Sequence, residues 1–254
     1  MAGLGLVEDT YNLRARLAPC VIVFLPVMFA VASWWPGEAK WPGILAGMGV
    51  SLALGTLLSQ LGRDLGKEKQ RKLFESWGGV PTTQLLSHRA STLNTHTLAR
   101  CHEALRQLRP ELRIPRSRDE EMADVVSSDA AYVSCTDSLR ELSRDKAKYP
   151  LVFEENVNFG FRRNLWAMKP AGVVIVSGST VACFGKAWGP LASAGTLEPV
   201  SGVFAVTCVA MLVIWCLRIT PTWVRAAAFS YAERLLGICE TLPPSKPESK
   251  IIMT

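Results

Sequence analysis

Residues 43–60 of this chain read GILAGMGVSLALGTLLSQ, and residues 62–77 continue as GRDLGKEKQRKLFESW. The first stretch is apolar and the second is highly charged. Within the apolar stretch a small residue recurs at every fourth position, namely Gly43, Gly47, Ser51, Gly55 and Ser59. Residues four apart share one face of an α-helix, so this spacing predicts a helix with a continuous ridge of small side chains. Such ridges allow transmembrane helices to approach one another closely.

This ridge has two interpretations. It is either a tight packing surface between helices of one subunit, or a subunit interface or pore-lining face that moves. The charged stretch is expected to carry the same helix on into water. One helix would then connect a packed membrane core to a basic soluble domain, and would serve as a lever between a binding event and a pore.

Four apolar segments have the length of a membrane span. They are Leu17–Trp35, Gly43–Gln60, Pro170–Ala187 and Gly202–Ile219, each close to the ~20 residues that a helix needs to cross a bilayer core. The first segment follows two arginines and resembles a signal peptide. Its continuation into the interfacial pair Trp34–Trp35 favours a span that is retained.

Basic residues set the expected orientation. They are concentrated in the N-terminal tail, the middle segment and the C-terminal tail, which we therefore place on the cytoplasmic side. No strand-like alternation of any useful length occurs, so we expect an all-α, polytopic membrane protein. It would have four transmembrane helices, with a helical cytoplasmic domain inserted between spans 2 and 3. The predicted parts are an N-terminal lead-in (1–16), a transmembrane hairpin (17–60), a basic helical domain (61–166), a second transmembrane hairpin (167–219), and a cytoplasmic C-terminal helix and tail (220–254).

Local signals divide the cytoplasmic segment into helices. Gly78 and Gly79 are expected to stop the helix of residues 62–77. Thr82 or Thr83 is expected to cap a short helix that follows. A single long helix is predicted for Glu120–Lys148, because its apolar residues recur with helical spacing.

Catalytic and metal-binding signals are weak. The histidines His88, His96 and His102 are eight and six residues apart, so they do not share one helical face, and the seven cysteines form no CxxC or CxxH pair. No nucleotide-binding or nucleophile motif is present. We therefore predict no catalytic residues, no metal and no cofactor. A membrane enzyme that uses an acid or one of these histidines stays open as a third alternative.

Basic residues form three clusters, one around residues 63–72, an arginine-rich one at residues 88–118, and the pair Arg162–Arg163. Arginine suits phosphate through its planar fork, and interleaved aromatic rings stack on bases. We therefore predict an anionic-ligand site. Its residues would be Arg71, Lys72, Trp77, His88, Arg89, Arg162 and Arg163. The alternative is that these cations follow the positive-inside bias, contact anionic membrane lipid, or pair with the many nearby acids.

Span three is the least apolar of the four, and polar residues in spans usually face the bundle interior or a water path. We predict that it lines a pore, with Ser177 and Thr180 facing the pore and Phe184 constricting it. The packing ridge is predicted on span two, at Gly47, Ser51 and Gly55.

Two segments have an unusual density of fixed turns, amides and aromatics: WGGVPTTQLLSHR (77–89) and ENVNFGFRRNL (155–165). With the four-span layout, they make the whole chain resemble bacterial membrane effectors of anti-phage defence, most closely the channel effectors of the Hailong system. The resemblance implies a homo-oligomeric ion channel, for which we take a tetramer as the working number. It also implies gating by a short DNA oligomer made by a partner nucleotidyltransferase.

The function expected from the sequence is thus an oligomeric pore in the bacterial inner (cell) membrane, gated by a nucleotide-derived or oligonucleotide ligand. Both termini would be cytoplasmic. The alternative is a non-channel membrane anchor whose cytoplasmic domain recruits a protein partner.

Overall fold

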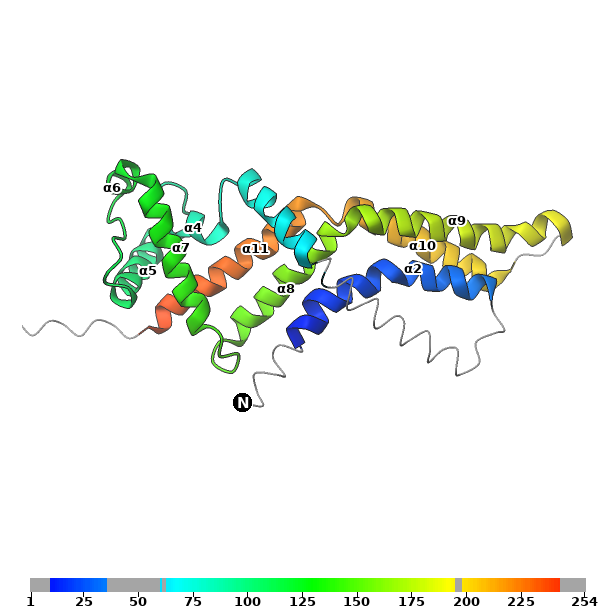
Figure 1. The fold of residues 1–254 in the computed structure, drawn as a ribbon, viewed down its shortest axis with the longest axis horizontal. Helices are drawn as coiled ribbons and strands as arrows, with labels where there is room; N and C mark the ends of the chain where they lie inside the picture. The colour runs from blue at the N-terminus through cyan, green and yellow to red at the C-terminus, as the bar shows by residue number, and fades with distance from the viewer. Residues whose placement is uncertain (1–9, 36–59, 61–62, 195–197, 243–254) are drawn as a thin grey trace, which may run out of the picture. The chain divides into compact units, whose positions relative to one another are not determined.

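A computed structural model describes residues 10–35, 60, 63–194 and 198–242. All regular structure in these ranges is helical, and they contain no strand (Figure 1). The all-helical fold predicted from the sequence is therefore confirmed for this part of the chain.

Three helical stretches are long and apolar enough to cross a membrane: Asn12–Trp34 with 23 residues, Lys169–Gly189 with 21 and Pro199–Leu217 with 19. The first consists of a π-helical turn, η1 (Asn12–Leu17), followed by α2 (Ala18–Trp34). These stretches overlap three of the four predicted spans, which supports a membrane protein. The remaining predicted span, and with it Gly47, Ser51 and Gly55, lies outside the described residues.

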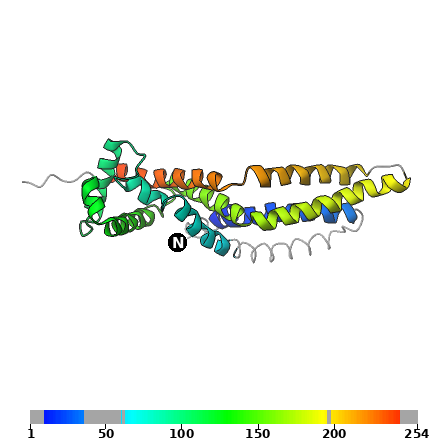
Figure 2. The same cartoon turned by 90° about the horizontal axis from the view of Figure 1, so that it is seen from above.

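The second and third stretches belong to α9 (Lys169–Ala194) and α10 (Pro199–Leu217), which form a hairpin. Helix α9 packs against both α2 and α10, and the three helices lie side by side in two views (Figures 1 and 2). Cys20, Val176, Cys208 and Trp215 contribute buried side chains to the shared core. Gly172 allows α9 and α10 to approach each other closely, because a Cβ at this position would lie only 2.6 Å from Cζ2 of Trp215.

Helices α2 and α9 run in the same direction. At one end the Asn164 side chain donates a hydrogen bond to the carbonyl of Ala15 (2.8 Å). At the other end the indole of Trp34 donates to the carbonyl of Ala182 (3.2 Å). We call the end with Ala15 and Asn164 the inner end and the end with Trp34 the far end.

The structure divides into two compact units. The first, here called the span unit, comprises the described residues up to Leu73 and from Val157 to Ala227. The second, here called the helical unit, comprises Phe74–Asn156 and the described residues from Ala228. Most of the helical unit thus comes from the predicted cytoplasmic insert, and the rest comes from the C-terminal part of the chain.

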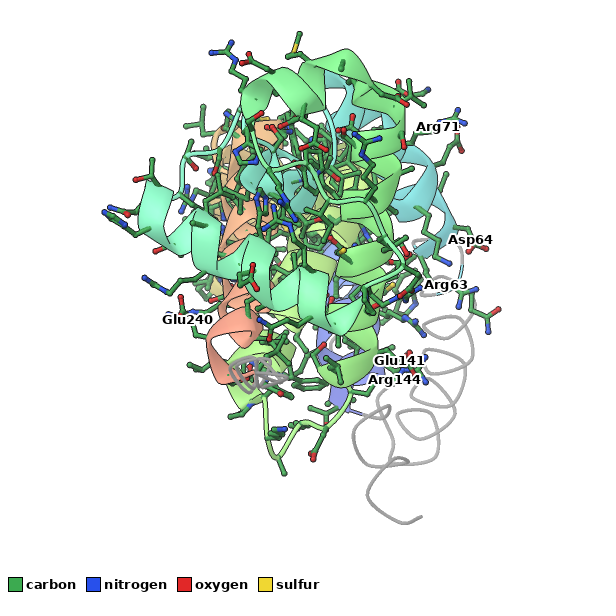
Figure 3. The ribbon with its side chains drawn as sticks, turned by 90° about the vertical axis from the view of Figure 1, so that its left-hand side faces the viewer. Arg63, Asp64, Arg71, Glu141, Arg144 and Glu240 are labelled. Atoms are coloured by element: carbon green, nitrogen blue, oxygen red, sulfur yellow. The ribbon has the colours of Figure 1, made fainter. Side chains whose placement is uncertain are left out.

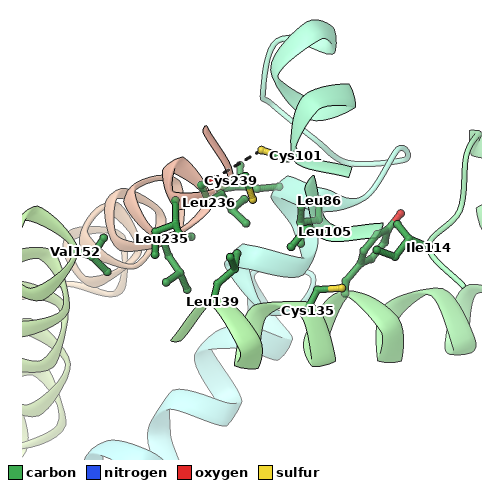
Figure 4. Close-up of a cluster of buried hydrophobic side chains, with 14 residues drawn as sticks. Leu86, Cys101, Leu105, Ile114, Cys135, Leu139, Val152, Leu235, Leu236 and Cys239 are labelled. Carbon is green, nitrogen blue, oxygen red and sulfur yellow. Dashed lines mark hydrogen bonds between the residues drawn. The ribbon is translucent and has the colours of Figure 1, made fainter. Parts of the chain in front are cut away.

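The helical unit contains α4 (Pro81–Leu86), α5 (Thr95–Leu108), α6 (Arg118–Ala123), α7 (Val125–Leu142) and the 3-10 turn η2 (Gly237–Thr241). It also takes the first part of α8 (Pro150–Ala167) and the last part of α11 (Pro221–Leu236). Leu86, Leu105, Leu139 and Leu235 are almost fully buried in its core (Figure 4). Burial of these leucines from four elements holds the unit together.

Two local predictions for the helical unit were wrong. The predicted helix Glu120–Lys148 is two helices, because Asp124 leaves helical geometry and its carboxylate accepts a hydrogen bond from the Ser127 amide as the N-cap of α7. Neither Thr82 nor Thr83 caps α4. Pro81 occupies the first turn, which suits its missing N–H, and both threonines are buried inside the helix.

The predicted charged helix is confirmed for residues 63–76. It ends where the sequence predicted, at Gly78 and Gly79, whose φ angles are 87° and 126°. This left-handed backbone favours glycine, since a side chain there would be strained. Arg63, Asp64 and Arg71 project away from this helix (Figure 3).

Candidate functional site

Charged side chains are divided unevenly between the two units. On the inner side of the spans, the described part of the span unit has only two acidic residues, Asp64 and Glu68. The basic residues there are Arg14, Arg16, Arg63, Lys67, Lys69, Arg71, Lys72, Arg162, Arg163, Lys169, Arg218 and Arg225. In the described helical unit, acids outnumber Lys and Arg. The excess of basic over acidic residues is therefore concentrated at the inner end of the described span unit.

The arginine-rich cluster of the helical unit is largely engaged with its own acids. Arg89 binds Glu121 (Nη1 to Oε1, 2.8 Å) and Asp129 (Nη2 to Oδ1, 2.6 Å). Glu121 is fully buried and also accepts a hydrogen bond from the His88 amide (2.6 Å). A buried carboxylate with these donors is a structural anchor that joins α4, α6 and α7.

Other arginines of this cluster form exposed ion pairs. Arg100 pairs with Glu240 and Arg113 with Glu120, at 2.8 and 3.2 Å, and Arg109 pairs with Glu111. The pKa of Glu120 is lowered by a hydrogen bond from the Arg116 amide and by its contact with Arg113. Exposed pairs of this kind contribute little stability individually.

The histidines occupy different environments. His102 is buried, its Nε2 donates to the carbonyl of Leu86 (2.7 Å), and its ring lies 4.6 Å from that of His88 and 5.8 Å from that of Tyr132. Burial lowers the pKa of His102 to about 4, so the ring is neutral at pH 7. His96, in contrast, is exposed on the first turn of α5.

The arginine pair of α8 belongs to the span unit. Arg162 donates to Asn158 Oδ1 (3.0 Å) and to the carbonyl of Trp223 (3.1 Å), and its guanidinium lies 4.9 Å from the centre of the Trp223 ring. Arg163 donates through Nη1 to Gln70 Oε1 (2.7 Å) and through both Nε and Nη2 to Asn164 Oδ1 (3.1 Å each). These side chains therefore join α8 to α11 and to the helix of residues 63–76.

Two glycines permit this convergence of helices at the inner end. A Cβ at Gly66 would lie 2.5 Å from Asn164 Oδ1, and one at Gly160 would lie 2.7 Å from the Tyr11 hydroxyl. Asn164 itself is buried and ties α8 to the first span through the carbonyl of Ala15. The helix of residues 63–76, α8 and the first span thus meet around the Asn164 side chain.

Lysines at the inner end bind helix carbonyls. Lys69 Nζ donates to the carbonyl of Ala167 (2.7 Å), at the C-terminus of α8, and lies 5.6 Å from the centre of the Trp166 ring. Lys169 Nζ donates to the carbonyls of Cys216 and Ile219 (3.2 and 2.9 Å), at the C-terminus of α10. A cation stabilises the partial negative charge at a helix C-terminus, so both lysines have a structural role.

The structure separates the predicted ligand-binding residues into two groups. Arg71 and Lys72 are exposed in the span unit, which also holds the arginine pair of α8. Trp77, His88 and Arg89 belong to the helical unit, where the Trp77 ring contacts the Phe74 ring in a tilted arrangement, with ring centres 5.7 Å apart. Their role in ligand binding stays a prediction.

The predicted pore residues lie on α9. Ser177 and Thr180 are half-buried, and Thr180 donates its hydroxyl hydrogen to the carbonyl of Val176 (2.7 Å). Phe184 is exposed and stacks on Trp188, with ring centres 4.5 Å apart. A more exposed face of the same helix carries Val174, Gly178, Val181 and Gly185.

Several residues that shape the inner end were not among the predicted site residues, namely Gly66, Lys69, Gln70 and Asn164. The basic cluster at residues 63–72 included Lys69, and the density of amides and arginines at residues 155–165 included Asn164, but neither Gly66 nor Gln70 carries a signal of its own. Within the described ranges, no group of three or more His, Cys, Asp or Glu side chains is placed to hold a metal ion.

Comparison with models of known families, with curated proteins and with solved structures found no match. The function of the chain therefore has to be argued from its own geometry and charge.

Proposed function

We propose that this chain is a four-span protein of the bacterial inner membrane that assembles into an ion channel and responds to an anionic, nucleotide-derived ligand. The same proposal includes a role as an anti-phage effector, whose ligand is an oligonucleotide made by a partner nucleotidyltransferase. Ligand binding is proposed because cations are concentrated at the inner end. At that end, the described residues of the span unit include only two acids.

Chain direction supports the fourth span. The first span ends at Trp34 at the far end, where the Trp34 indole donates a hydrogen bond to the carbonyl of Ala182. The helix of residues 63–76 lies at the inner end, where Gln70 bonds to Arg163. The chain has to return from one end to the other between these points, which is what a span at residues 43–60 would do.

The exposed face of α9 supports assembly. Val174, Gly178, Val181 and Gly185 recur at alternating spacings of four and three residues, the spacing of a helix-packing seam. In the apolar windows of the three described spans only 22–28% of residues are buried. Small residues on such a face allow close contact with another transmembrane helix, and we assign this face to contacts between copies.

Two lysines on the helix of residues 63–76 support the ligand part. Lys67 and Lys72 are exposed, and neither pairs with a carboxylate among the residues the structure describes. They are therefore open to phosphate groups, whereas Arg89 in the helical unit already binds two carboxylates.

The test is ion flux through the purified protein in liposomes, with and without short single-stranded DNA. We expect flux that changes with DNA, and loss of that change in the Lys67→Gln/Lys72→Gln double variant. The matched control is Arg140→Gln/Arg144→Gln, which removes the same charge from exposed pairs of the helical unit. No flux under any condition would refute the channel and favour the anchor alternative.

A second variant tests assembly. Gly178→Leu should disrupt the oligomer but leave the single chain folded, because no atom lies within 4 Å of a Cβ at this position. Gly202→Leu is the control, since a Cβ there is equally unobstructed but belongs to α10. An unchanged oligomer in Gly178→Leu would refute the assignment of this face.

A further inference from the structure

Arg163 differs from Arg89, another partly buried arginine with several partners. Arg89 binds the carboxylates of Glu121 and Asp129. The acceptors of Arg163 are the neutral amide oxygens of Gln70 and Asn164, and no carboxylate of the described residues forms an ion pair with it. Amide oxygens satisfy hydrogen bonds but do not neutralise a charge, so the guanidinium keeps a full positive charge without a counter-ion.

The bonding of Arg163 is also incomplete. A guanidinium has five N–H donors, one on Nε and two on each terminal nitrogen. Gln70 takes one donor from Nη1, and Asn164 takes the Nε donor and one from Nη2. One N–H therefore remains on each terminal nitrogen, and these donors are available to an anionic oxygen such as that of a phosphate.

Two more cations lie on the elements that meet near Arg163. Arg16 lies close enough for its charge to act on Arg163, and Lys69 is held by the carbonyl of Ala167. In the residues described, neither pairs with an acid. Burial lowers the pKa of Arg163, Tyr11 partly opposes this, and the nearby charge of Arg16 adds to it, although an arginine stays protonated at neutral pH. An uncompensated, partly buried charge is costly, and an anion at this place offsets the cost.

The depth of Arg163 matches the phosphate layer of a bilayer. The 21-residue span Lys169–Gly189 has a helical length of about 31 Å, close to the ~30 Å thickness of the hydrocarbon core. Arg163 lies on α8, a separate helix, six residues before the start of this span, and the helical rise puts it within about 9 Å of that start. Trp166 lies between them, and tryptophan is enriched at this depth.

We propose that Arg163, with Arg16 and Lys69, binds the phosphate of an anionic phospholipid at the inner leaflet. The lipid supplies the counter-ion that the described residues do not provide, and it would hold α8, the first span and the helix of residues 63–76 together. This site does not rest on channel activity or on a nucleotide ligand.

The experiment titrates the full-length protein in detergent with phosphatidylglycerol or phosphatidylcholine and measures lipid retention by native mass spectrometry. The wild type should bind phosphatidylglycerol more tightly, and Arg163→Gln should weaken this binding about ten-fold or more, as loss of charged hydrogen bonds does. Arg218→Gln is the matched control, because Arg218 is an exposed inner-end cation at the end of α10. Equal losses in both variants, or no loss in Arg163→Gln, would overturn the proposal.

Gln70→Glu separates lipid binding from folding. The new carboxylate would accept the Nη1 bond now made at 2.7 Å and neutralise Arg163 from within the chain. The variant should resist thermal unfolding in lipid-free detergent at least as well as the wild type, yet retain about ten-fold less phosphatidylglycerol. Unchanged phosphatidylglycerol retention in a folded Gln70→Glu protein would overturn the proposal.

A second arm identifies the source of the phosphate. The same variants are titrated with a short single-stranded DNA in phosphatidylcholine nanodiscs. DNA binding that is insensitive to Arg163→Gln, together with sensitive phosphatidylglycerol binding, supports the lipid site. The reverse pattern would overturn it and assign Arg163 to a nucleotide phosphate instead.

Discussion

Acid should destabilise the helical unit through His102. This side chain is 1% exposed, and burial lowers its pKa from 6.5 to about 4. In the unfolded chain the ring takes up a proton near pH 6.5, whereas in the folded unit it resists protonation until about pH 4. The unfolded state therefore binds more protons between these values, and the free energy of unfolding falls as the pH falls.

The magnitude follows from the two pKa values. The penalty is close to zero at pH 7.5, reaches about 2 kcal/mol at pH 5, and is complete at about 3 kcal/mol below pH 4. Besides burial, the charges of His88 and Arg106 lower this pKa, while the hydrogen bond to the carbonyl of Leu86 raises it.

The assay is pulse proteolysis in increasing urea, on the full-length protein in detergent, at pH 7.5 and pH 5. His102→Gln keeps a donor for the Leu86 carbonyl but cannot be protonated, so it should lose about 2 kcal/mol less than the wild type between the two pH values. His96→Gln is the control, because His96 is exposed, and it should follow the wild type. Equal losses in the wild type and in His102→Gln would refute the reasoning.

Two further predictions concern packing and charge. Glu121→Gln should lower the stability of the helical unit by about 2–4 kcal/mol in the same assay, because it removes a fully buried carboxylate from Arg89; a loss under about 1 kcal/mol would contradict that role. Gly172→Ala should lower the thermal-unfolding midpoint of the span unit, since its Cβ would lie 2.6 Å from Trp215, at a cost of about 1–3 kcal/mol. Gly202→Ala is the control, because it gains the same helix propensity without a steric clash. Equal unfolding midpoints in the two variants would rule out a clash between the Cβ at position 172 and Trp215.

The sequence predicted the features that depend on local chemistry. Apolar length predicted the three described helices that are long and apolar enough to cross a membrane, because crossing a bilayer requires a run of about 20 apolar residues. The Gly78–Gly79 pair predicted the end of the helix of residues 63–76. The break between α6 and α7 was missed because Asp124 was read as one more helical residue rather than as a cap.

The sequence did not show which side chains pair with one another across long sequence distances. Arg89 and Arg163 are both arginines in basic segments, and composition alone treated them alike. The structure gives Arg89 carboxylate partners 32 and 40 residues away, whereas the hydrogen-bond acceptors of Arg163 among the described residues are amides. Which arginine has a counter-ion depends on how the helices pack, and packing has no short-range sequence signal.

The unequal division of charge makes the two units respond oppositely to ionic strength. At about 0.15 M salt the screening length is about 8 Å. Raising the salt relieves repulsion among the crowded cations of the inner end, but it weakens exposed pairs of the helical unit such as Arg100–Glu240. Concentrated salt also competes for Arg163 with any bound lipid phosphate. The buffer used for extraction therefore decides whether the isolated protein retains the anion that completes its inner end.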